Sequence, residues 1–191
     1  MGWKIFTAFI KSKNEINIDT NFIESIGFRG FEFTEETEFD FGPNIGELYV
    51  AKRNGNILIS NADLIWQFTK PKTSKTEISF LSAFPESEIA TINLGYGSYF
   101  SVLDNGKKIR TREVGDEVYL DIGELLPEEK SIKTEDLIHP EDLEEMKLNC
   151  TPEEIENEIQ SNLAYETCFE LTKRFFGKRL DELNMEDYKF S

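Results

Sequence analysis

The chain has 191 residues, a length that suits one folded domain or two small ones. It contains 37 Asp and Glu residues against 21 Lys and Arg residues, so its formal net charge is −16. Surfaces that bind nucleic-acid backbones or anionic lipids are normally basic, so this charge argues against direct binding to nucleic acid or to a membrane. The sequence also lacks a signal-peptide pattern and an apolar run as long as a membrane span, and we therefore expect a cytoplasmic protein.

The N-terminal part of the chain predicts short strands and one short helix. Residues 3–10 are rich in apolar β-formers and predict an opening strand. Residues 19–26 begin with a capping Asp and carry spaced apolar side chains, which is typical of a short helix. Alternation of phenylalanine with acidic residues around Phe31, Phe33, Phe39 and Phe41 fits a half-buried strand or a sheet edge.

Two Asn-Gly pairs, at residues 54–55 and 105–106, predict β-hairpins, because this pair supplies the two positive-φ positions of a type I′ turn. The segments between the two hairpins predict a short helix capped by Ser60 or Asn61 and a strand over residues 89–94. Residues 69–76 are polar and interrupted by proline, as in a linker or a surface loop.

The last third of the chain predicts helices. Residues 136–148 should include a short helix with Pro140 in its first turn. Thr151 is followed by proline and two glutamates, the signature of a capping box, and an apolar stripe then continues as far as Phe175 before Gly177. This pattern predicts a helix of about seven turns, either continuous or broken near its middle. Hairpins followed by helices predict a single α+β domain over residues 1–191, with a mainly antiparallel sheet and the long C-terminal helix packed on one face.

No catalytic, metal or cofactor signature stands out. His139 is the only histidine, and His139-Pro140-Glu141 matches only the first half of the zinc-deaminase pattern, because Cys150 has no second cysteine at the required spacing. Cys150 and Cys168 match no metal or redox motif, and we expect both to be reduced. We therefore predict no catalytic residue, no metal ligand and no cofactor.

One strand carries an unusual basic stripe. Lys108, Arg110 and Arg112 are two residues apart, so in a regular strand all three side chains point to one face. Such a face is suited to a small anionic ligand, but in a chain of this charge we favour the alternative given next. The alternative is that it pairs with residues 124–158, which hold 13 acidic and 3 basic residues, a net charge of −10.

Four short blocks resemble an uncharacterised family of bacterial intracellular proteins, a domain of unknown function. They are residues 2–4, the 105–110 hairpin, the 123–129 turn and residues 169–178. The resemblance implies a bacterial cytoplasmic protein. It implies no activity and adds no catalytic residue.

Three functions follow from these patterns. The absence of a catalytic signature and the acidic segment favour a non-enzymatic interaction module that neutralises or regulates a basic protein partner. The first alternative is a binder of small anions, or an enzyme, with a pocket near residues 107–113 walled by Trp66, Tyr96 or Tyr99. The second alternative is a nucleic-acid mimic that occupies a DNA-binding protein. The sequence does not indicate the oligomeric state.

Overall fold

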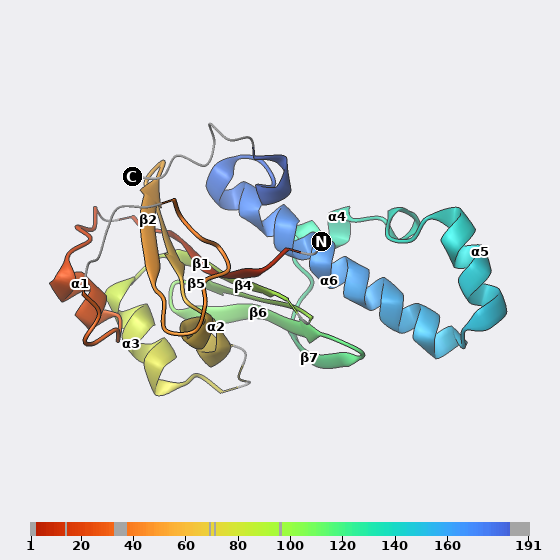
Figure 1. Ribbon diagram of the computed structural model, residues 1–191, viewed down its shortest axis with the longest axis horizontal. Coiled ribbons are helices and arrows are strands. Elements are labelled where there is room, and N and C mark those ends of the chain that lie inside the picture. Colours follow the sequence, from red (N-terminus) through yellow and green to blue (C-terminus); the bar gives the residue numbers. More distant parts are fainter. Residues whose placement is uncertain are drawn as a thin grey trace.

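A seven-stranded antiparallel sheet forms the centre of the protein, as Figure 1 shows. The computed structural model describes residues 3–13, 15–32, 38–68, 70, 72–95 and 97–183. Neighbouring strands follow the order β2-β3-β1-β4-β5-β6-β7, and each pair is antiparallel. The strands are β1 (Ile5–Lys11), β2 (Tyr49–Arg53), β3 (Asn56–Ser60), β4 (Glu88–Leu94), β5 (Ser98–Asp104), β6 (Lys107–Val114) and β7 (Val118–Gly123).

Helices pack on both faces of this sheet. They are α1 (Thr20–Ser25), α2 (Ala62–Phe68), α3 (Lys75–Ala83), α4 (Pro127–Ser131), α5 (Pro140–Asn149) and α6 (Pro152–Phe176), with single 3-10 turns at η1 (Thr134–Asp136) and η2 (Leu180–Glu182). The predicted α+β fold with a mainly antiparallel sheet is therefore confirmed. No helix among the described residues is both long enough and apolar enough to cross a bilayer.

The sheet separates two apolar cores. On one face Phe9 and Phe100 pack with Leu171 and Phe175 of α6. On the other face, the side chains of β1, β3, β4 and β5 pack with those of α1, α2 and α3, including Phe68 and Phe80. Burying one such side chain contributes about 1.5–3 kcal/mol, so these two cores supply most of the favourable free energy of folding.

Both predicted hairpins are confirmed. Asn54 and Gly55 have φ angles of 50° and 79°, and Asn105 and Gly106 have φ angles of 48° and 74°. These positive values are the ones that a type I′ turn requires, and they join β2 to β3 and β5 to β6.

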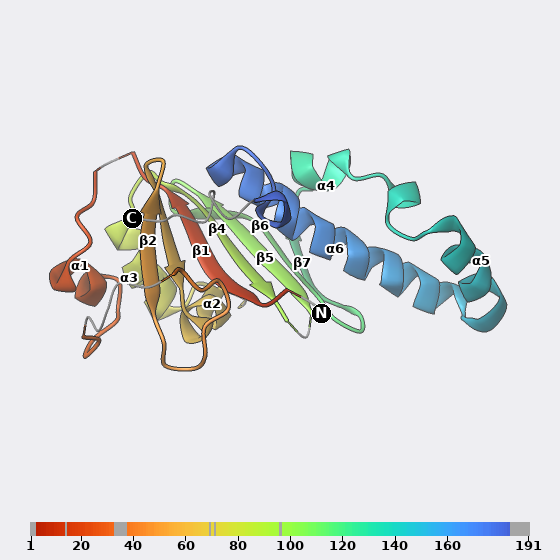
Figure 2. The same cartoon turned by 45° about the horizontal axis from the view of Figure 1, so that its top comes forward.

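The long C-terminal helix is also confirmed, and it does not break. Thr151 Oγ1 accepts a hydrogen bond from the Glu154 N–H while the Glu154 carboxylate accepts one from the Thr151 N–H, and Gly177 ends the helix with φ of 78°. Every buried residue of α6 lies between Ala164 and Phe175. The first half of α6 therefore contributes nothing to the buried core and extends beyond the sheet (Figures 1 and 2).

The structure differs from the sequence expectations in the N-terminal and central segments. Phe31, Phe39 and Phe41 lie outside any strand, and Phe33 lies outside the described residues. Phe41 instead stacks on Phe9 in the core, with ring centroids 6.3 Å apart. The polar segment 69–76 contains the start of α3, where Ser74 and Glu77 form a capping box. Strand β7 and helix α4 were not predicted.

Candidate functional site

The three basic residues of β6 do not share one face of the sheet, so that prediction is wrong. Arg110 lies opposite Val102 of β5, whereas Lys108 lies opposite Leu103, because a β-bulge shifts the register between them. The extra residue of a bulge reverses the alternation of side chains beyond it. Lys108 consequently faces α2 and α3, while Arg110 and Arg112 face α4 and α6.

Lys108 holds the end of α2 against the start of α3. Its ammonium nitrogen lies 3.1 Å from the carbonyl oxygens of Phe68 and Lys70 and 3.2 Å from Oε1 of Glu77. The two carbonyl oxygens accept hydrogen bonds from the ammonium group, whereas Glu77 Oε1 forms an ion pair with it. The Glu77 side chain is fully buried, so Lys108 also supplies the charge that makes its burial tolerable.

Arg110 forms a bidentate ion pair with Glu129 of α4. Its Nε and Nη2 donate to the two carboxylate oxygens at 2.9 and 2.7 Å, and both side chains are fully buried. The remaining nitrogen, Nη1, donates to the Asp121 carboxylate and to the carbonyl oxygens of Ile122 and Gly123. Burial opposes the charge on Arg110, but the hydrogen bonds to Glu129 and Asp121 outweigh it and raise the guanidinium pKa.

Arg112 extends the same network to α6. It donates to Oε1 of Glu129 at 3.4 Å and to the side-chain oxygen of Gln160 in α6, and it lies 3.8 Å from the Asp121 carboxylate. Glu129 additionally accepts a hydrogen bond from the Leu126 N–H at 2.8 Å, which caps α4. The network therefore joins β6, β7, α4 and α6.

These contacts answer whether the basic strand is open or paired with the acidic segment 124–158. Arg110 and Arg112 pair with Glu129 of that segment, and Lys108 is held on the opposite face of the sheet.

Of the three aromatic residues suggested as pocket walls, Tyr99 belongs to the core on the opposite face from Arg110, Trp66 belongs to α2, and Tyr96 lies outside the described residues. Binding of an anion by Lys108, Arg110 and Arg112 stays a prediction, and their intramolecular partners weigh against it.

A third arginine, in α6, fixes α4 to α6 and β4. Arg174 of α6 donates two hydrogen bonds to Glu128, at 2.6 and 2.7 Å, and one to Glu88 at 2.6 Å. Hydrogen bonding to Glu128 raises the pKa of Arg174 despite partial burial. Burial alone would raise the pKa of Glu128, but the bonds and charge of Arg174 outweigh it and lower that pKa.

The rest of the acidic segment projects away from the sheet. We call residues 135–158 the acidic arm. They comprise the end of η1, all of α5 and the first turns of α6, and they contain ten carboxylates and one lysine, a formal charge of −9. No residue of α5 is buried, and the two helices lie side by side beyond the body of the protein (Figure 2). Glu128 and Glu129 are thus neutralised at the base of the arm, whereas most carboxylates of the arm itself face solvent.

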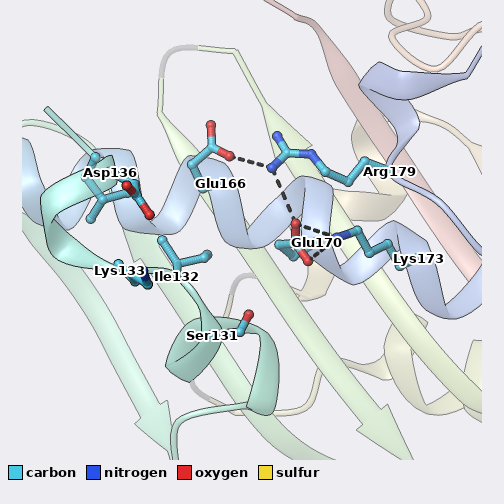
Figure 3. Close-up of a pocket in the computed structure, with 9 residues that line it drawn as sticks. Ser131, Ile132, Lys133, Asp136, Glu166, Glu170, Lys173 and Arg179 are labelled. Carbon is cyan, nitrogen blue, oxygen red and sulfur yellow. Dashed lines mark hydrogen bonds and ion pairs between the residues drawn. The ribbon is translucent and has the colours of Figure 1, made fainter. Parts of the chain in front are cut away.

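An open hollow of about 330 Å³ lies where the arm joins the body (Figure 3). Four of its six charged residues pair with one another: Arg179 lies 2.7 Å from Glu166, and Lys173 lies 2.8 Å from Glu170. The other two, Lys133 and Asp136, have opposite charges. Because these charges cancel, the hollow offers no concentrated charge to a ligand. It is lined by Ser131, Ile132, Lys133, Asp136, Leu137, Glu166, Glu170, Lys173 and Arg179.

The other residues singled out in the sequence lie apart from one another. His139 is exposed at the start of α5, Cys150 is half-buried and Cys168 is buried in the core, where burial raises the pKa of its thiol. Within the part of the chain that the structure describes, no group of three or more His, Cys, Asp or Glu side chains is placed to hold a metal ion.

The chain matched no model of a known protein family, no curated protein and no solved structure. The resemblance to an uncharacterised bacterial family accordingly stays an expectation. Any function must be argued from the geometry and charge of the molecule itself.

Proposed function

We propose that this protein is a non-enzymatic interaction module that binds a basic protein partner through the acidic arm, and so neutralises or regulates that partner. The supporting observation is that carboxylates within residues 124–158 differ in whether an arginine neutralises them. Glu128 and Glu129 are paired with buried or half-buried arginines, while residues 135–158 carry a charge of −9 on two helices with few basic neighbours.

Electrostatics would give such an arm its function. Exposed charges act over about one Debye length, roughly 8–10 Å at physiological salt, and a surface of one sign raises the rate of encounter with a partner of opposite sign. The few exposed ion pairs of the arm, such as Glu144 with Lys147 at 2.7 Å, neutralise little of its charge. Leu148 at the end of α5 is 85% exposed and would supply an apolar contact among the charges.

Rigid attachment of the acidic arm to the sheet would make its surface specific for one partner. The Arg110–Glu129 pair, the Arg112–Gln160 bond and the Arg174–Glu128 pair fasten α4 and α6 to the sheet. A partner would therefore meet an arm held in a fixed direction, which lowers the entropy lost on binding. We place this module in the cytoplasm of a bacterium, in keeping with the composition and the family resemblance.

Pull-down from a bacterial lysate at low and at high salt tests the proposal, with the recovered proteins identified by mass spectrometry. The arm variant neutralises four exposed carboxylates of α5: Glu141→Gln, Asp142→Asn, Glu144→Gln and Glu145→Gln. The matched control neutralises four exposed carboxylates elsewhere: Glu15→Gln, Glu24→Gln, Glu38→Gln and Glu86→Gln. Basic proteins should be recovered at low salt with the wild type and the control but not with the arm variant. Equal recovery with the arm variant, or no basic protein at low salt, would contradict the proposal.

A nucleic-acid mimic is the second candidate, and one observation favours it. The arm carboxylates are distributed along two helices rather than confined to one loop. If the recovered partner binds DNA, added duplex should displace it from the arm. A partner that stays bound in excess duplex would identify a basic partner of another kind.

A further inference from the structure

Strand β7 is an open edge of the sheet. It is the last strand in the sheet order, and no strand among the described residues pairs with its outer side. The outward backbone N–H and C=O groups of such a strand are a template for another strand. At the end of β7 the carbonyl oxygens of Ile122 and Gly123 already accept hydrogen bonds from Arg110, so the template is the part of the strand before them. Five of its six residues are exposed, including Val118, Tyr119 and Ile122. Ile109 and Leu125 add two more exposed apolar side chains from β6 and from the segment after β7.

This edge lacks most of the features that normally protect edge strands. Protection usually comes from lysine, proline, a bulge or a covering segment. Residues Val118–Gly123 contain neither lysine nor proline, and their one charge, Asp121, pairs with Arg110 and Arg112 while 47% of its side chain stays exposed. A bulge lies at the start of the strand, opposite Val114, and Leu120–Gly123 pair in regular register after it. The opposite edge, β2, differs because it ends in Lys52 and Arg53.

The charges around β7 indicate the chemistry of an added strand. Asp116 and Glu117 precede the strand, Glu124 follows it, and Glu113 lies beside it on β6. Glu113 shares its face of the sheet with Leu120 and Ile122. The cations of a segment that turns its apolar side chains to Ile122 would therefore meet the carboxylates at the two ends of β7, Asp116, Glu117 and Glu124. A second copy of this chain is a poor fit, because antiparallel pairing of two β7 strands would bring Glu117 of each copy toward Glu124 of the other.

We propose that β7 accepts an extended segment of the basic partner by strand addition, and that this segment alternates Lys or Arg with apolar residues. Alternation would present apolar side chains to Ile122 and its neighbours and cations to the flanking carboxylates. This inference rests on the proposed function, since it takes the partner to be basic. Figures 1 and 2 show that the acidic arm extends from the body on the β7 side of the sheet, so one partner can contact both surfaces.

Amide hydrogen exchange, followed by NMR on the full chain, tests the proposal with a synthetic peptide of alternating Lys and Val. At a peptide concentration ten times its Kd, exchange of the outward amides of β7 should slow about tenfold, whereas exchange in β2 should not change. A peptide of the same sequence, N-methylated at every internal residue, keeps the charge and the side chains but cannot form the strand ladder. It should not slow exchange in β7.

A pair of matched variants separates the edge from general electrostatics. Ile122→Lys and Ile45→Lys each replace an exposed isoleucine by lysine, but Ile45 lies in the segment before β2. Ile122→Lys should weaken peptide binding about tenfold, while Ile45→Lys should leave it nearly unchanged. Equal weakening by both variants would overturn strand addition.

The remaining outcomes distinguish this inference from the proposed function. If the peptide perturbs amides of the arm but not of β7, strand addition is wrong and the acidic arm is still supported as the docking surface. If β7 becomes protected without peptide as the protein concentration rises, and sedimentation shows a dimer, the occupant is a second copy and the inference fails. If the peptide affects neither surface, both the inference and an electrostatic role of the arm are contradicted.

Discussion

Arg110 and Glu129 form a fully buried, bidentate ion pair that ties β6 to α4, with nitrogen–oxygen distances of 2.9 and 2.7 Å. The pair unites two features that are separate in the sequence, a basic strand and an acidic segment. The two arginines of β6, Arg110 and Arg112, therefore stabilise the fold. The acidic arm, in contrast, keeps most of its carboxylates in solvent.

Breaking this pair should destabilise the protein strongly. Glu129→Ala leaves Arg110 and Arg112 without their shared carboxylate, and removing one partner of a buried pair costs about 3–5 kcal/mol. Urea unfolding should show this loss as a lower midpoint. The double variant Arg110→Met, Glu129→Leu should recover part of it, because Arg110 is then no longer an unpaired buried charge and Arg112 keeps Gln160 and Asp121 as partners. A loss below about 1 kcal/mol in Glu129→Ala would show that the network is not structural.

The pair of Glu128 with Arg174 predicts a pH dependence of stability. The pKa of Glu128 is lowered in the folded protein, so the folded chain holds this proton more weakly than the unfolded chain. The stability it contributes is complete above the unfolded glutamate pKa of about 4.3 and is lost as the pH falls through the lower folded value. Glu128→Gln should therefore lower the free energy of unfolding at neutral pH. It should also make that free energy fall less steeply as the pH drops into the acid range. Urea midpoints measured between neutral and acidic pH check this, with the exposed Glu86→Gln as control.

Lys108 should act on stability and not on ligand binding. Lys108→Met would remove the charge that compensates the fully buried Glu77 and free the carbonyl oxygens at the end of α2. We expect a loss of about 3 kcal/mol or more, and faster hydrogen exchange in α2 and α3. Lys107→Met, one residue earlier and exposed, is the matched control and should change stability little. Similar stability for the two variants would contradict this role.

How far the sequence predicts this fold depends on how local each interaction is. The two Asn-Gly hairpins and the Thr151 capping box were predictable because their signals involve residues within a few positions of one another. The bulge beside Lys108 was not, because it depends on the register that β6 takes against β5. Strand β7 was missed because it is exposed on both faces, and so shows no clean alternation of apolar and polar residues.

In the candidate site too, local features are predictable from the sequence and contacts between distant residues are not. The acidic charge of residues 124–158 is visible in the composition, but the sequence does not say which carboxylates are buried. Glu129 reaches Arg110 across 19 residues of chain, and Gln160 reaches Arg112 across 48. Only the packed structure separates these paired groups from the arm that stays in solvent.

The capping box of α6 gives the arm its own stability, separate from that of the core. Thr151 and Glu154 satisfy two early backbone N–H groups, and hydrogen bonds from Thr151 lower the pKa of the Glu154 carboxyl. Thr151→Ala removes one of these bonds, and loss of a helix N-cap costs about 1 kcal/mol. Because the first half of α6 contributes no buried residue, this change should loosen the arm without lowering the stability of the sheet. Hydrogen exchange should then accelerate about fivefold at the start of α6 and in α5, with no change in β1, β4 or β5. Acceleration throughout the sheet would mean instead that arm and core unfold as one unit.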